Sequence, residues 1–485
     1  VRSGKLLWTF NTIPRPGEFG NDTWEKESWA TNGNTGVWTQ ITVDEDLGLV
    51  YLPVEDPTSD LYGGHRPGNN LFGDSLVCVD LKTGQRKWHF QIVHHPIWDY
   101  DLPAAPLLAD INVNGKAIKA VAQATKQGLL YVFDRVTGQP VWPIEERPVP
   151  QTDVPGEKTS PTQPVPTKPP AYSRNGVVEG DLIDFTPELK AQGLEAAKRY
   201  RLGPVFLPPT VSKTEGPLAA LTAGTLSGGV NWPGSAYDPE MHAFFTHACN
   251  ACVAPLGLVA PPKEFSDLDY VMGTAGQTFR AITGGGEGEA ADAPRPARPA
   301  TPPPPPAPPT PTAGAAGAAG GGRGAPAGGG GFGATVQGLS IVKPPYGQIV
   351  GINLDKGELM WSTPHGDTPD GVRNHPALRG VNIPKTGQSG NVGVVVTKTL
   401  VIAGDPLVTT TPEHPRGAML RAYDKNTGAQ VGAVWMPAPQ SGSPMTYAVD
   451  GRQYIIVAVS GGNYSGEYIA FSLPASAART PTGGQ

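Results

Sequence analysis

The sequence is poor in cysteine, in long apolar runs and in clustered basic residues, and each shortage excludes a class of protein. Its 485 residues include only three cysteines, too few for a disulfide framework. No apolar run approaches the roughly 18 residues that a membrane helix needs. Lysine and arginine number 37 against 43 aspartate and glutamate residues, which gives a net charge of −6. Without a long basic cluster, we expect no nucleic-acid partner.

Two of the cysteines, Cys249 and Cys252, are separated by two residues. This spacing suits a metal site, a redox pair or haem attachment. However, Val253 stands where a c-type haem motif needs histidine, and the chain has no second such pair for a zinc site. We therefore expect ordinary packed or loop cysteines, with a local disulfide as the next possibility.

Glycine and proline, in contrast, are abundant. The 63 glycines and 54 prolines make up roughly a quarter of the chain, about twice the usual share. Part of the excess lies in residues 284–336, a low-complexity insertion that we expect to be a disordered surface loop. The excess persists outside this insertion, so turns are frequent along the whole chain. This composition favours a turn-dense all-β protein over a helical bundle, and ten tryptophans supply material for its core.

One short pattern recurs along the chain: an apolar strand, an aspartate, a glycine two to four residues later, and then a tryptophan. The aspartate and glycine are typical of a tight turn, and the tryptophan that follows can wedge between neighbouring sheets. Repeated hairpins of this kind predict a radial stack of β-sheet blades, a β-propeller. The copies are Gly4 and Trp8; Asp80, Gly84 and Trp88; Asp134, Gly138 and Trp142; Asp355, Gly357 and Trp361; and, more loosely, Asp424, Gly428 and Trp435.

Two features interrupt this pattern. Residues 143–226 read as a proline-rich loop and a helical insertion, with a helix over 186–203 that begins at Thr186 and Pro187 and stops at Gly203. The first repeat starts inside its turn, with no preceding aspartate or strand. We therefore expect residues 1–485 to form a single propeller domain that is N-terminally incomplete, part of a longer protein.

Several segments are more specific than the repeat. The longest is HHPIWDYDLPAAPLLADI at 94–111; others are GQPVWPIEERPVPQ at 138–151, GEKTSPTQP at 156–164, KPPYGQIVGINL at 343–354 and SPMTYAVDGRQYIIVA at 443–458. With the repeats, they resemble the quinoprotein dehydrogenases that use pyrroloquinoline quinone (PQQ), most closely the membrane-bound glucose dehydrogenase branch. The resemblance implies an eight-bladed propeller that moves a hydride from an alcohol carbon to the quinone.

The resemblance assigns the chemistry to two residues. Asp99, directly after Trp98, would be the base that takes the hydroxyl proton, although it could merely cap a turn. Lys126 would place a cation against the quinone oxygens and stabilise the charge that develops there. The competing interpretation of Lys126 is a solvated residue at a strand edge.

The resemblance also assigns the cofactor contacts. Trp38 would be a flat platform beneath the quinone rings, and its competing role is an ordinary core tryptophan. Asn231 and Trp232, in GGVNWPGSAYDP at 228–239, would hold the rim of the cofactor, or else form a simple turn. His94 and His95 either face the cofactor or fix the loop, and the sequence does not decide between them.

A calcium ion, or another divalent or lanthanide ion, would be bound beside the base. Asp99 and Asp56 are the expected ligands, because carboxylate oxygens suit hard cations. Asp56 departs from the family pattern, since Glu55-Asp56 stands where relatives usually show Gly-Asn. Asp101 adds a further carboxylate two residues after the base, as in lanthanide-using relatives, but glucose-type members share it.

The interpretation as a whole is a PQQ-dependent dehydrogenase that oxidises an aldose such as glucose or another alcohol. The resemblance implies a periplasmic or secreted location, and a quinone or cytochrome c as electron acceptor. Membrane association would come only through a missing N-terminal part or a partner. Two alternatives remain: a soluble alcohol dehydrogenase of the methanol or ethanol type, and a non-catalytic propeller scaffold of the cell envelope.

Overall fold

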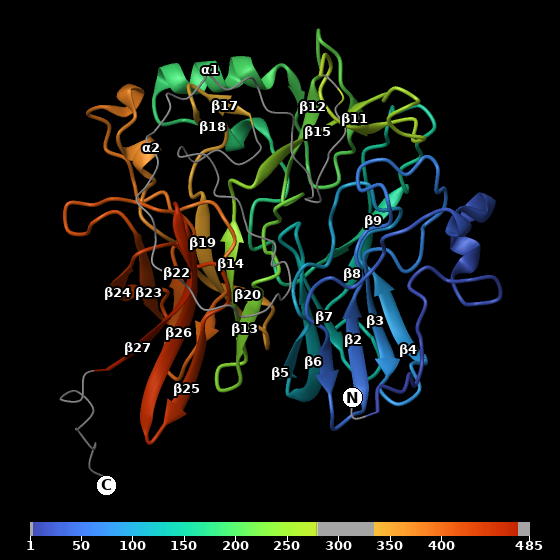
Figure 1. Ribbon diagram of the computed structural model, residues 1–485, viewed down its shortest axis with the longest axis horizontal. Coiled ribbons are helices and arrows are strands. Elements are labelled where there is room, and N and C mark those ends of the chain that lie inside the picture. Colours follow the sequence, from blue (N-terminus) through green and yellow to red (C-terminus); the bar gives the residue numbers. More distant parts are fainter. Residues whose placement is uncertain (1–2, 278, 280–333, 474–485) are drawn as a thin grey trace, which may run out of the picture.

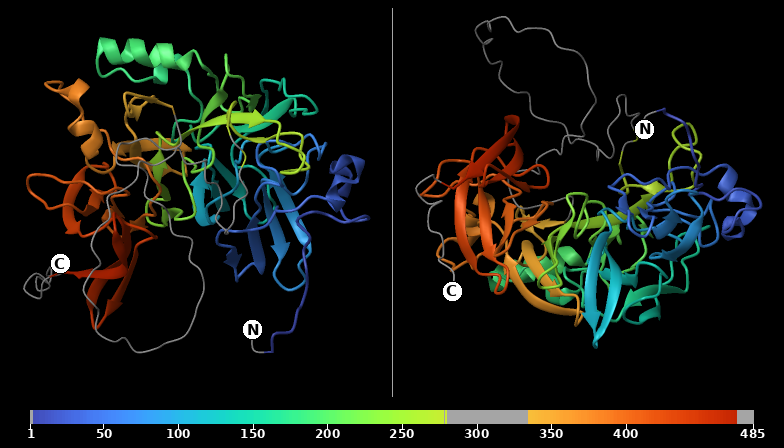
Figure 2. Two further views of the ribbon diagram at one scale, coloured as in Figure 1. Left: turned by 45° about the horizontal axis from the view of Figure 1, so that its top comes forward. Right: turned by 90° about the horizontal axis from the view of Figure 1, so that it is seen from below.

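The structure is a computed structural model that describes residues 3–277, 279 and 334–473. It is built mainly from antiparallel sheets, as the turn-rich composition predicts (Figure 1). Seen from below, the sheets follow one another around an arc, with the N-terminal and C-terminal sheets at its two ends (Figure 2). Residues 284–333 of the expected low-complexity loop lie outside the described residues.

Five sheets in the described residues have the strand order of propeller blades, in which consecutive strands are neighbours or, in the third sheet, are separated by an insertion. The first contains β1 (Thr42–Asp44), β2 (Leu49–Pro53), β3 (Ser75–Asp80) and β4 (Arg86–Gln91); the second β5 (Leu107–Val113), β6 (Lys116–Ala124) and β7 (Leu130–Asp134); the third β13 (Ser235–Asp238), β14 (Ala243–Cys249), β19 (Gly347–Asn353) and β20 (Glu358–Pro364); the fourth β21 (Val395–Val396), β22 (Leu400–Gly404), β23 (Ala418–Asp424) and β24 (Gln430–Met436); and the fifth β25 (Met445–Val449), β26 (Arg452–Gly461) and β27 (Tyr464–Ser472).

The remaining elements lie before the blades, between them, or in the insertion that separates β14 from β19 in the third sheet. They include a further sheet of order β10-β12-β15-β11, with β16 paired to β15, and two hairpins, β8-β9 and β17-β18. The 3₁₀-helices are η1 (Asn21–Thr23), η2 (Glu25–Ala30), η3 (Glu179–Asp181) and η4 (Pro376–Leu378), and the α-helices are α1 (Pro187–Ala197) and α2 (Asp370–Arg373). The strands are β8 (Ile144–Pro148), β9 (Thr162–Pro166), β10 (Tyr200–Arg201), β11 (Thr210–Val211), β12 (Ala219–Ala223), β15 (Val253–Val259), β16 (Val271–Met272), β17 (Thr335–Val336) and β18 (Leu339–Ser340).

The predicted helix begins where the sequence places it but ends early. The Thr186 hydroxyl accepts a hydrogen bond from the Leu189 N–H at 3.2 Å, and Pro187 is the first helical residue. The helix ends at Ala197, and Gly203 instead exchanges two backbone hydrogen bonds with Val177. The expected end of the low-complexity insertion at residue 336 was also wrong, because residues 335–336 form β17.

The repeated tryptophans pack between neighbouring repeats, as predicted. The indole of each of the first four copies lies against the turn glycine of the next copy, so a Cβ on that glycine would collide with or crowd the ring. The distance from such a Cβ atom to the nearest atom of the indole is 2.5 Å for Gly84 with Trp8, 2.6 Å for Gly138 with Trp88, 3.0 Å for Gly357 with Trp142 and 2.5 Å for Gly428 with Trp361.

The looser fifth copy does not follow this rule, because the Trp435 indole N–H donates to Pro415 O at 3.2 Å, near its own sheet.

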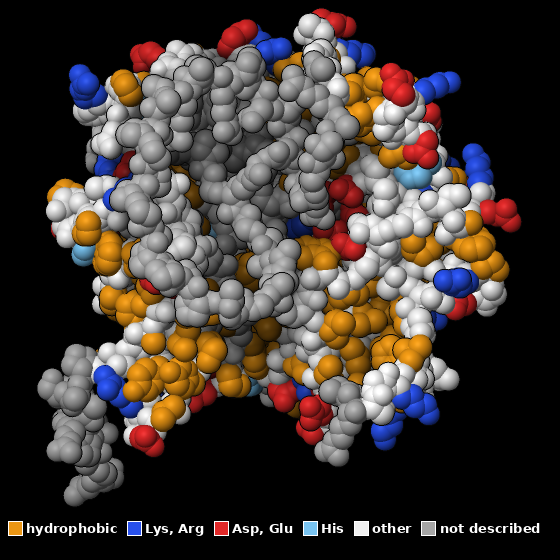
Figure 3. Space-filling model, viewed as in Figure 1, with side chains coloured by type: hydrophobic (Ala, Val, Ile, Leu, Met, Phe, Trp, Pro, Cys, Tyr) orange, Lys and Arg blue, Asp and Glu red, His pale blue; other side chains and the backbone are white. Residues whose placement is uncertain are grey.

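Hydrophobic side chains are exposed over β25–β27, on the lower left of Figure 3, and they include Met445, Val449 and Tyr468. Among the described residues, no helix has both the length and the apolar character needed to cross a bilayer.

Candidate active site

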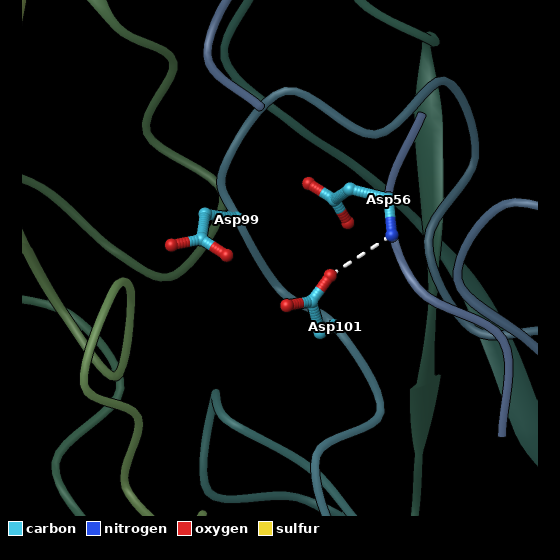
Figure 4. A group of neighbouring side chains, drawn as sticks. All are labelled: Asp56, Asp99 and Asp101. Atoms are coloured by element: carbon cyan, nitrogen blue, oxygen red, sulfur yellow. Dashed lines mark hydrogen bonds between the residues drawn. The ribbon is translucent and has the colours of Figure 1, made fainter. Parts of the chain in front are cut away.

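Three aspartates from two loops converge at one point of the molecule (Figure 4). Asp56 follows β2, whereas Asp99 and Asp101 lie in the loop that follows β4. Each offers a carboxylate oxygen, and the three oxygens lie within 4.8 Å of one another. The backbone N–H of Asp56 donates to Asp101 Oδ1 at 2.9 Å, which ties the two loops together. The structure therefore brings together the predicted base, the predicted second ligand and the additional carboxylate.

The loop that carries Asp99 is held in an unusual shape. Trp98 is fully buried, and its indole N–H donates to Leu207 O at 3.0 Å. His95 and Asp99 have φ values of 48° and 56°, in the left-handed region that non-glycine residues rarely adopt. Backbone of this kind costs on the order of 1–3 kcal/mol per residue and persists only where its surroundings enforce it. The packing of Trp98 is part of what fixes the Asp99 carboxyl group.

His95 also fixes this loop. Its Nε2 lies 2.7 Å from Glu157 Oε1 and its Nδ1 lies 2.7 Å from Gly68 O. The other carboxylate oxygen of Glu157 accepts the Gly63 N–H at 2.5 Å. His94, in contrast, is partly exposed and contacts Glu146 at 3.0 Å. Both histidines thus contact protein groups, which favours loop fixation over cofactor contact. Sequence reasoning missed Glu157, although it lies in the quoted segment 156–164.

Lys126 bridges two of the acids. Its Nζ lies 2.6 Å from Asp99 Oδ1 and 2.8 Å from Asp101 Oδ2, and its side chain is only 3% exposed. The sequence predicted that Lys126 lies in a strand, but the residue lies in the turn between β6 and β7. The interpretation of Lys126 as a solvated edge residue is wrong, because the ammonium group is buried against two carboxylates.

The charges of this group are strongly coupled to one another. Burial favours the neutral form of Asp99 and raises its pKa well above the ordinary value, although Lys126 opposes the shift. Burial acts the same way on Asp101 and is the largest single influence there. The Lys126 charge and the hydrogen bonds that Asp101 accepts together outweigh it, so the pKa of Asp101 lies below the usual value. The pKa of Lys126 is raised, because the two carboxylates outweigh its burial. Asp101 is thus the permanent counter-ion, and Asp99 is the carboxyl group best suited to exchange a proton.

A fourth acid, Asp74, was not expected from the sequence. It lies opposite Glu55 at the start of β3, and its N–H donates to Glu55 O at 3.3 Å. Asp56 and Asp74 are 1% and 0% exposed, and their carboxyl groups contact each other. Burial raises the pKa of Asp74 to about 8, and burial together with Asp74 raises the pKa of Asp56. No sequence signal distinguishes Asp74 from an ordinary turn residue before a strand.

The predicted cofactor contacts lie on segments that join this cluster. The backbone leading to Trp38 runs beside Asp56, because the Thr35 N–H donates to Asp56 O at 3.0 Å. The Gly229 N–H donates to Lys126 O at 2.6 Å, two residues before Asn231. The residues Trp38 and Trp232 are 42% and 43% exposed, so neither is an ordinary core tryptophan.

The residues present fit both a hard cation and a planar quinone. No lysine, arginine, hydroxyl or backbone N–H of the described chain hydrogen-bonds to the carboxyl oxygens of Asp56. A buried carboxylate without such partners is costly, and a cation with oxygen ligands would satisfy it. Lys126 offers a buried positive charge for quinone oxygens, and Trp38 offers an exposed aromatic face.

The two neighbouring cysteines form a bond that the sequence ranked second. Cys249 and Cys252 are joined in a disulfide, so the preference for unlinked cysteines was wrong and the alternative is the observed state. Cys78 is free and buried in β3. The disulfide leaves no free thiol at Cys249 or Cys252 for haem attachment or zinc, in line with the absence of those motifs in the sequence.

The sheets have the strand order of propeller blades, and three carboxylates that could hold an ion converge in the loops beside them. Comparison with known families agrees, because residues 1–276 and 321–455 match the family described as the glucose/ethanol/alcohol dehydrogenase β-propeller domain, named for PQQ. The chain therefore belongs to the PQQ-dependent quinoprotein dehydrogenase family.

Individual relatives include enzymes named for glycerol and for glucose. It is 28% identical to the glycerol dehydrogenase large subunit of Gluconobacter oxydans, over 98% of this chain and 58% of that protein. It is 28% identical to the quinoprotein glucose dehydrogenase of Escherichia coli, over 98% of this chain and 53% of that protein. The chain thus spans little more than half the length of these relatives. Among solved structures, a quinohemoprotein alcohol dehydrogenase from Pseudomonas putida matches with a TM-score of 0.53 and 18% identity, over 95% of this chain and 51% of that one, which supports the fold.

Proposed function

We propose that the protein is a PQQ-dependent dehydrogenase that oxidises a hydroxyl group of an aldose or another alcohol. The observation that carries the proposal is the cluster of Asp99, Asp101 and Lys126 beside Asp56, within a chain of the quinoprotein family. When bound, PQQ would supply the carbonyl carbon that accepts a hydride, and a hard cation such as calcium would polarise the adjacent oxygen.

Each residue of the cluster has a defined task in this proposal. The Asp99 side chain is 12% exposed, so one edge of its carboxyl group can receive the proton of the substrate hydroxyl. Lys126 donates to Asp99 Oδ1 and so orients the carboxylate toward that proton. After proton transfer, the neutral Asp99 leaves the Lys126 charge to Asp101 and to any negative charge that develops nearby.

The remaining residues would hold the cofactor and the cation. Asp56 and Asp99 are the proposed cation ligands, with Asp101 held in place by its hydrogen bond from the Asp56 N–H. Trp38, Asn231, Trp232 and Lys126 are the proposed cofactor contacts. Lys126 therefore has two roles, as an orienting group for Asp99 and as the charge beside the quinone.

The names of the relatives support a substrate class. Their names include glycerol, glucose and quinate dehydrogenases, whose substrates share a secondary or anomeric hydroxyl on a polar carbon skeleton. We infer a polyhydroxylated substrate rather than methanol. The Cys249–Cys252 disulfide supports an oxidising location such as the periplasm. A quinone or a cytochrome c would accept the electrons.

A substrate panel tests the proposal. The protein purified from its host is incubated with PQQ and Ca²⁺ and given glucose, glycerol, quinate, methanol or ethanol with an artificial electron acceptor. Dye reduction with one of the polyhydroxylated substrates supports the proposal, whereas reduction only with methanol or ethanol would favour the alcohol dehydrogenase alternative. Binding of neither PQQ nor Ca²⁺ would leave a non-catalytic propeller scaffold.

A further inference from the structure

The disulfide lies beside the segment that links the catalytic cluster to the proposed cofactor contacts. We name residues 224–232 the glycine segment. Its Thr225 hydroxyl donates to the carbonyl of Trp98, the residue before the proposed base. Its Gly229 N–H donates to Lys126 O at 2.6 Å, and the segment ends on Asn231 and Trp232. One stretch of backbone therefore contacts both the base loop and Lys126.

The fit between this segment and Lys126 is tight. A Cβ on Gly224 would lie 2.3 Å from Lys126 O, and one on Gly228 would lie 3.0 Å from Lys126 Cγ. Distances below about 3 Å cannot be tolerated in a packed interior. Any displacement of the glycine segment therefore moves Lys126 or opens space around it.

The two linked cysteines hold the glycine segment at its first residue, Gly224, and at Gly229, three residues before its end. The Gly224 N–H donates to Cys252 O at 3.0 Å, and the Cys249 N–H donates to Gly229 O at 2.7 Å. Cys249 ends β14 in the third blade, whereas Cys252 precedes β15 in the additional sheet. The disulfide thus fixes the separation of the two anchors at the junction of two sheets. Both cysteines are at least nine-tenths buried.

We infer that the Cys249–Cys252 disulfide is a positioning element that holds the glycine segment, and through it Lys126, Asn231 and Trp232, in the conformation that binds the cofactor. The inference rests on the proposed function. Without the bond, the anchors separate more freely and the segment populates other conformations. The apparent affinity for the cofactor then falls by the fraction of time spent in the competent conformation.

The test compares the protein with the bond intact and broken. The native protein is compared with a Cys249→Ala/Cys252→Ala double variant, and with native protein treated with dithiothreitol, which becomes a cyclic disulfide as the Sγ–Sγ bond gives two thiols. Mass spectrometry of peptides confirms the state of the bond. Cys78→Ala is the matched control, because it removes a buried cysteine that makes no disulfide.

Two readouts separate this inference from the proposed function. The first is hydrogen exchange of the peptide covering 224–232, which we expect to accelerate when the bond is broken and to stay unchanged in Cys78→Ala. The second is the Kd for PQQ in the presence of Ca²⁺, which we expect to rise about tenfold, as it does when one conformer in ten is competent. Turnover at saturating PQQ should return to within about twofold of native, since the catalytic groups are intact.

The outcomes that overturn the inference are distinct from those that overturn the function. Unchanged exchange in 224–232 with the bond broken would show that the disulfide does not hold the segment. A PQQ Kd within twofold of native would show that the bond does not position the cofactor contacts. If the native protein bound no PQQ, the proposed function would fail, and the exchange experiment would still decide whether the disulfide holds the segment.

Discussion

The Lys126 ammonium nitrogen lies 2.6 Å from Asp99 Oδ1, and the same nitrogen lies 2.8 Å from Asp101 Oδ2. One buried cation is therefore shared between two carboxylates that stand two residues apart. The pKa values of these carboxyls move in opposite directions. At Asp101 the Lys126 charge and the accepted hydrogen bonds together outweigh burial, whereas at Asp99 burial outweighs Lys126. The pair thus separates a permanent counter-ion from a group that can take up a proton.

Replacement of the positively charged Lys126 side chain should destabilise the protein. In Lys126→Met, two buried carboxyl groups lose their partner, and breaking a buried ion pair from one side typically costs about 3–5 kcal/mol. Chemical denaturation at pH 7 measures the loss. Lys119→Met, at an exposed position of β6, is the matched control and should lose less than about 0.5 kcal/mol. Equal stability of the two variants would contradict the described ion pairs.

Asp74 contacts the proposed ligand Asp56 and should therefore strengthen the binding of a metal ion there. Asp74→Asn removes an acidic group that contacts Asp56 and that a nearby cation would help to ionise, and changes next to metal ligands typically cost 10- to 100-fold in affinity. Calorimetric titration with Ca²⁺ measures the effect. Asp46→Asn, which removes the same charge from an exposed turn, should change the affinity less than about twofold.

Stability separates this effect from damage to the fold. Because burial disfavours the ionised form of Asp74, a form that asparagine cannot adopt, the cation-free Asp74→Asn protein should melt at the same temperature as the native protein or higher. A lower melting temperature together with unchanged Ca²⁺ affinity would mean that Asp74 is only structural.

The contacts between repeats can be measured with two glycines. Gly138 and Gly115 have φ values of 74° and 81°, so alanine is strained at both, but only Gly138 faces an indole, that of Trp88. The strain costs about 1–2 kcal/mol in each variant, and overpacking against Trp88 adds about 1–3 kcal/mol in Gly138→Ala. Equal losses of unfolding free energy in Gly138→Ala and Gly115→Ala would show that the tryptophan contact contributes nothing.

His365 should make the stability depend on pH. It is fully buried, beside Tyr423 and Gly404 O, and burial together with the nearby Arg421 and Lys385 lowers its pKa to about 3, opposed by Asp367 and the Gly404 carbonyl. The unfolded chain protonates this histidine near the ordinary histidine pKa of 6.5. The folded protein therefore binds fewer protons below that pH, and its stability falls as the pH drops from 6.5 toward 3.

A variant isolates this contribution. His365→Gln should reduce the slope of unfolding free energy against pH by about 1.4 kcal/mol per unit between pH 4 and 6. His414→Gln, at an exposed position, should keep the native slope. Identical slopes in native protein and His365→Gln would show that His365 is protonated in the folded state.

Much of the fold could be predicted from the sequence, because its signals are local. The turn aspartates and glycines act within four residues, and the tryptophan that follows each turn reaches only the next repeat. The start of α1 at Thr186 and Pro187 is likewise a local capping signal. Its end at Ala197 was not predictable, because the chain leaves the helix to pair Tyr200 and Arg201 with β12, a contact between distant segments.

The site was predictable only where a motif marked it. Asp99 and Lys126 came from the family resemblance, and the structure adds their direct ion pair. Asp74 and the disulfide were missed or ranked second, because their meaning depends on neighbours that are distant in sequence. Asp74 looks like any aspartate before a strand, and only its contact with Asp56 in the folded chain shows that it belongs to the acidic cluster. The spacing of Cys249 and Cys252 likewise gives no sign of their hydrogen bonds to Gly229 and Gly224, which form only in the folded chain.

The central claim is that the Asp99 carboxylate receives the hydroxyl proton of the substrate. The most direct measurement is the single-turnover rate of bound PQQ reduction by the best substrate of the panel, in native protein and in Asp99→Asn, together with the PQQ Kd of each. We expect the rate to fall by about 10²- to 10⁴-fold, as for loss of a general base, while the Kd changes less than about tenfold. A rate within about threefold of native, with PQQ bound, would contradict the account.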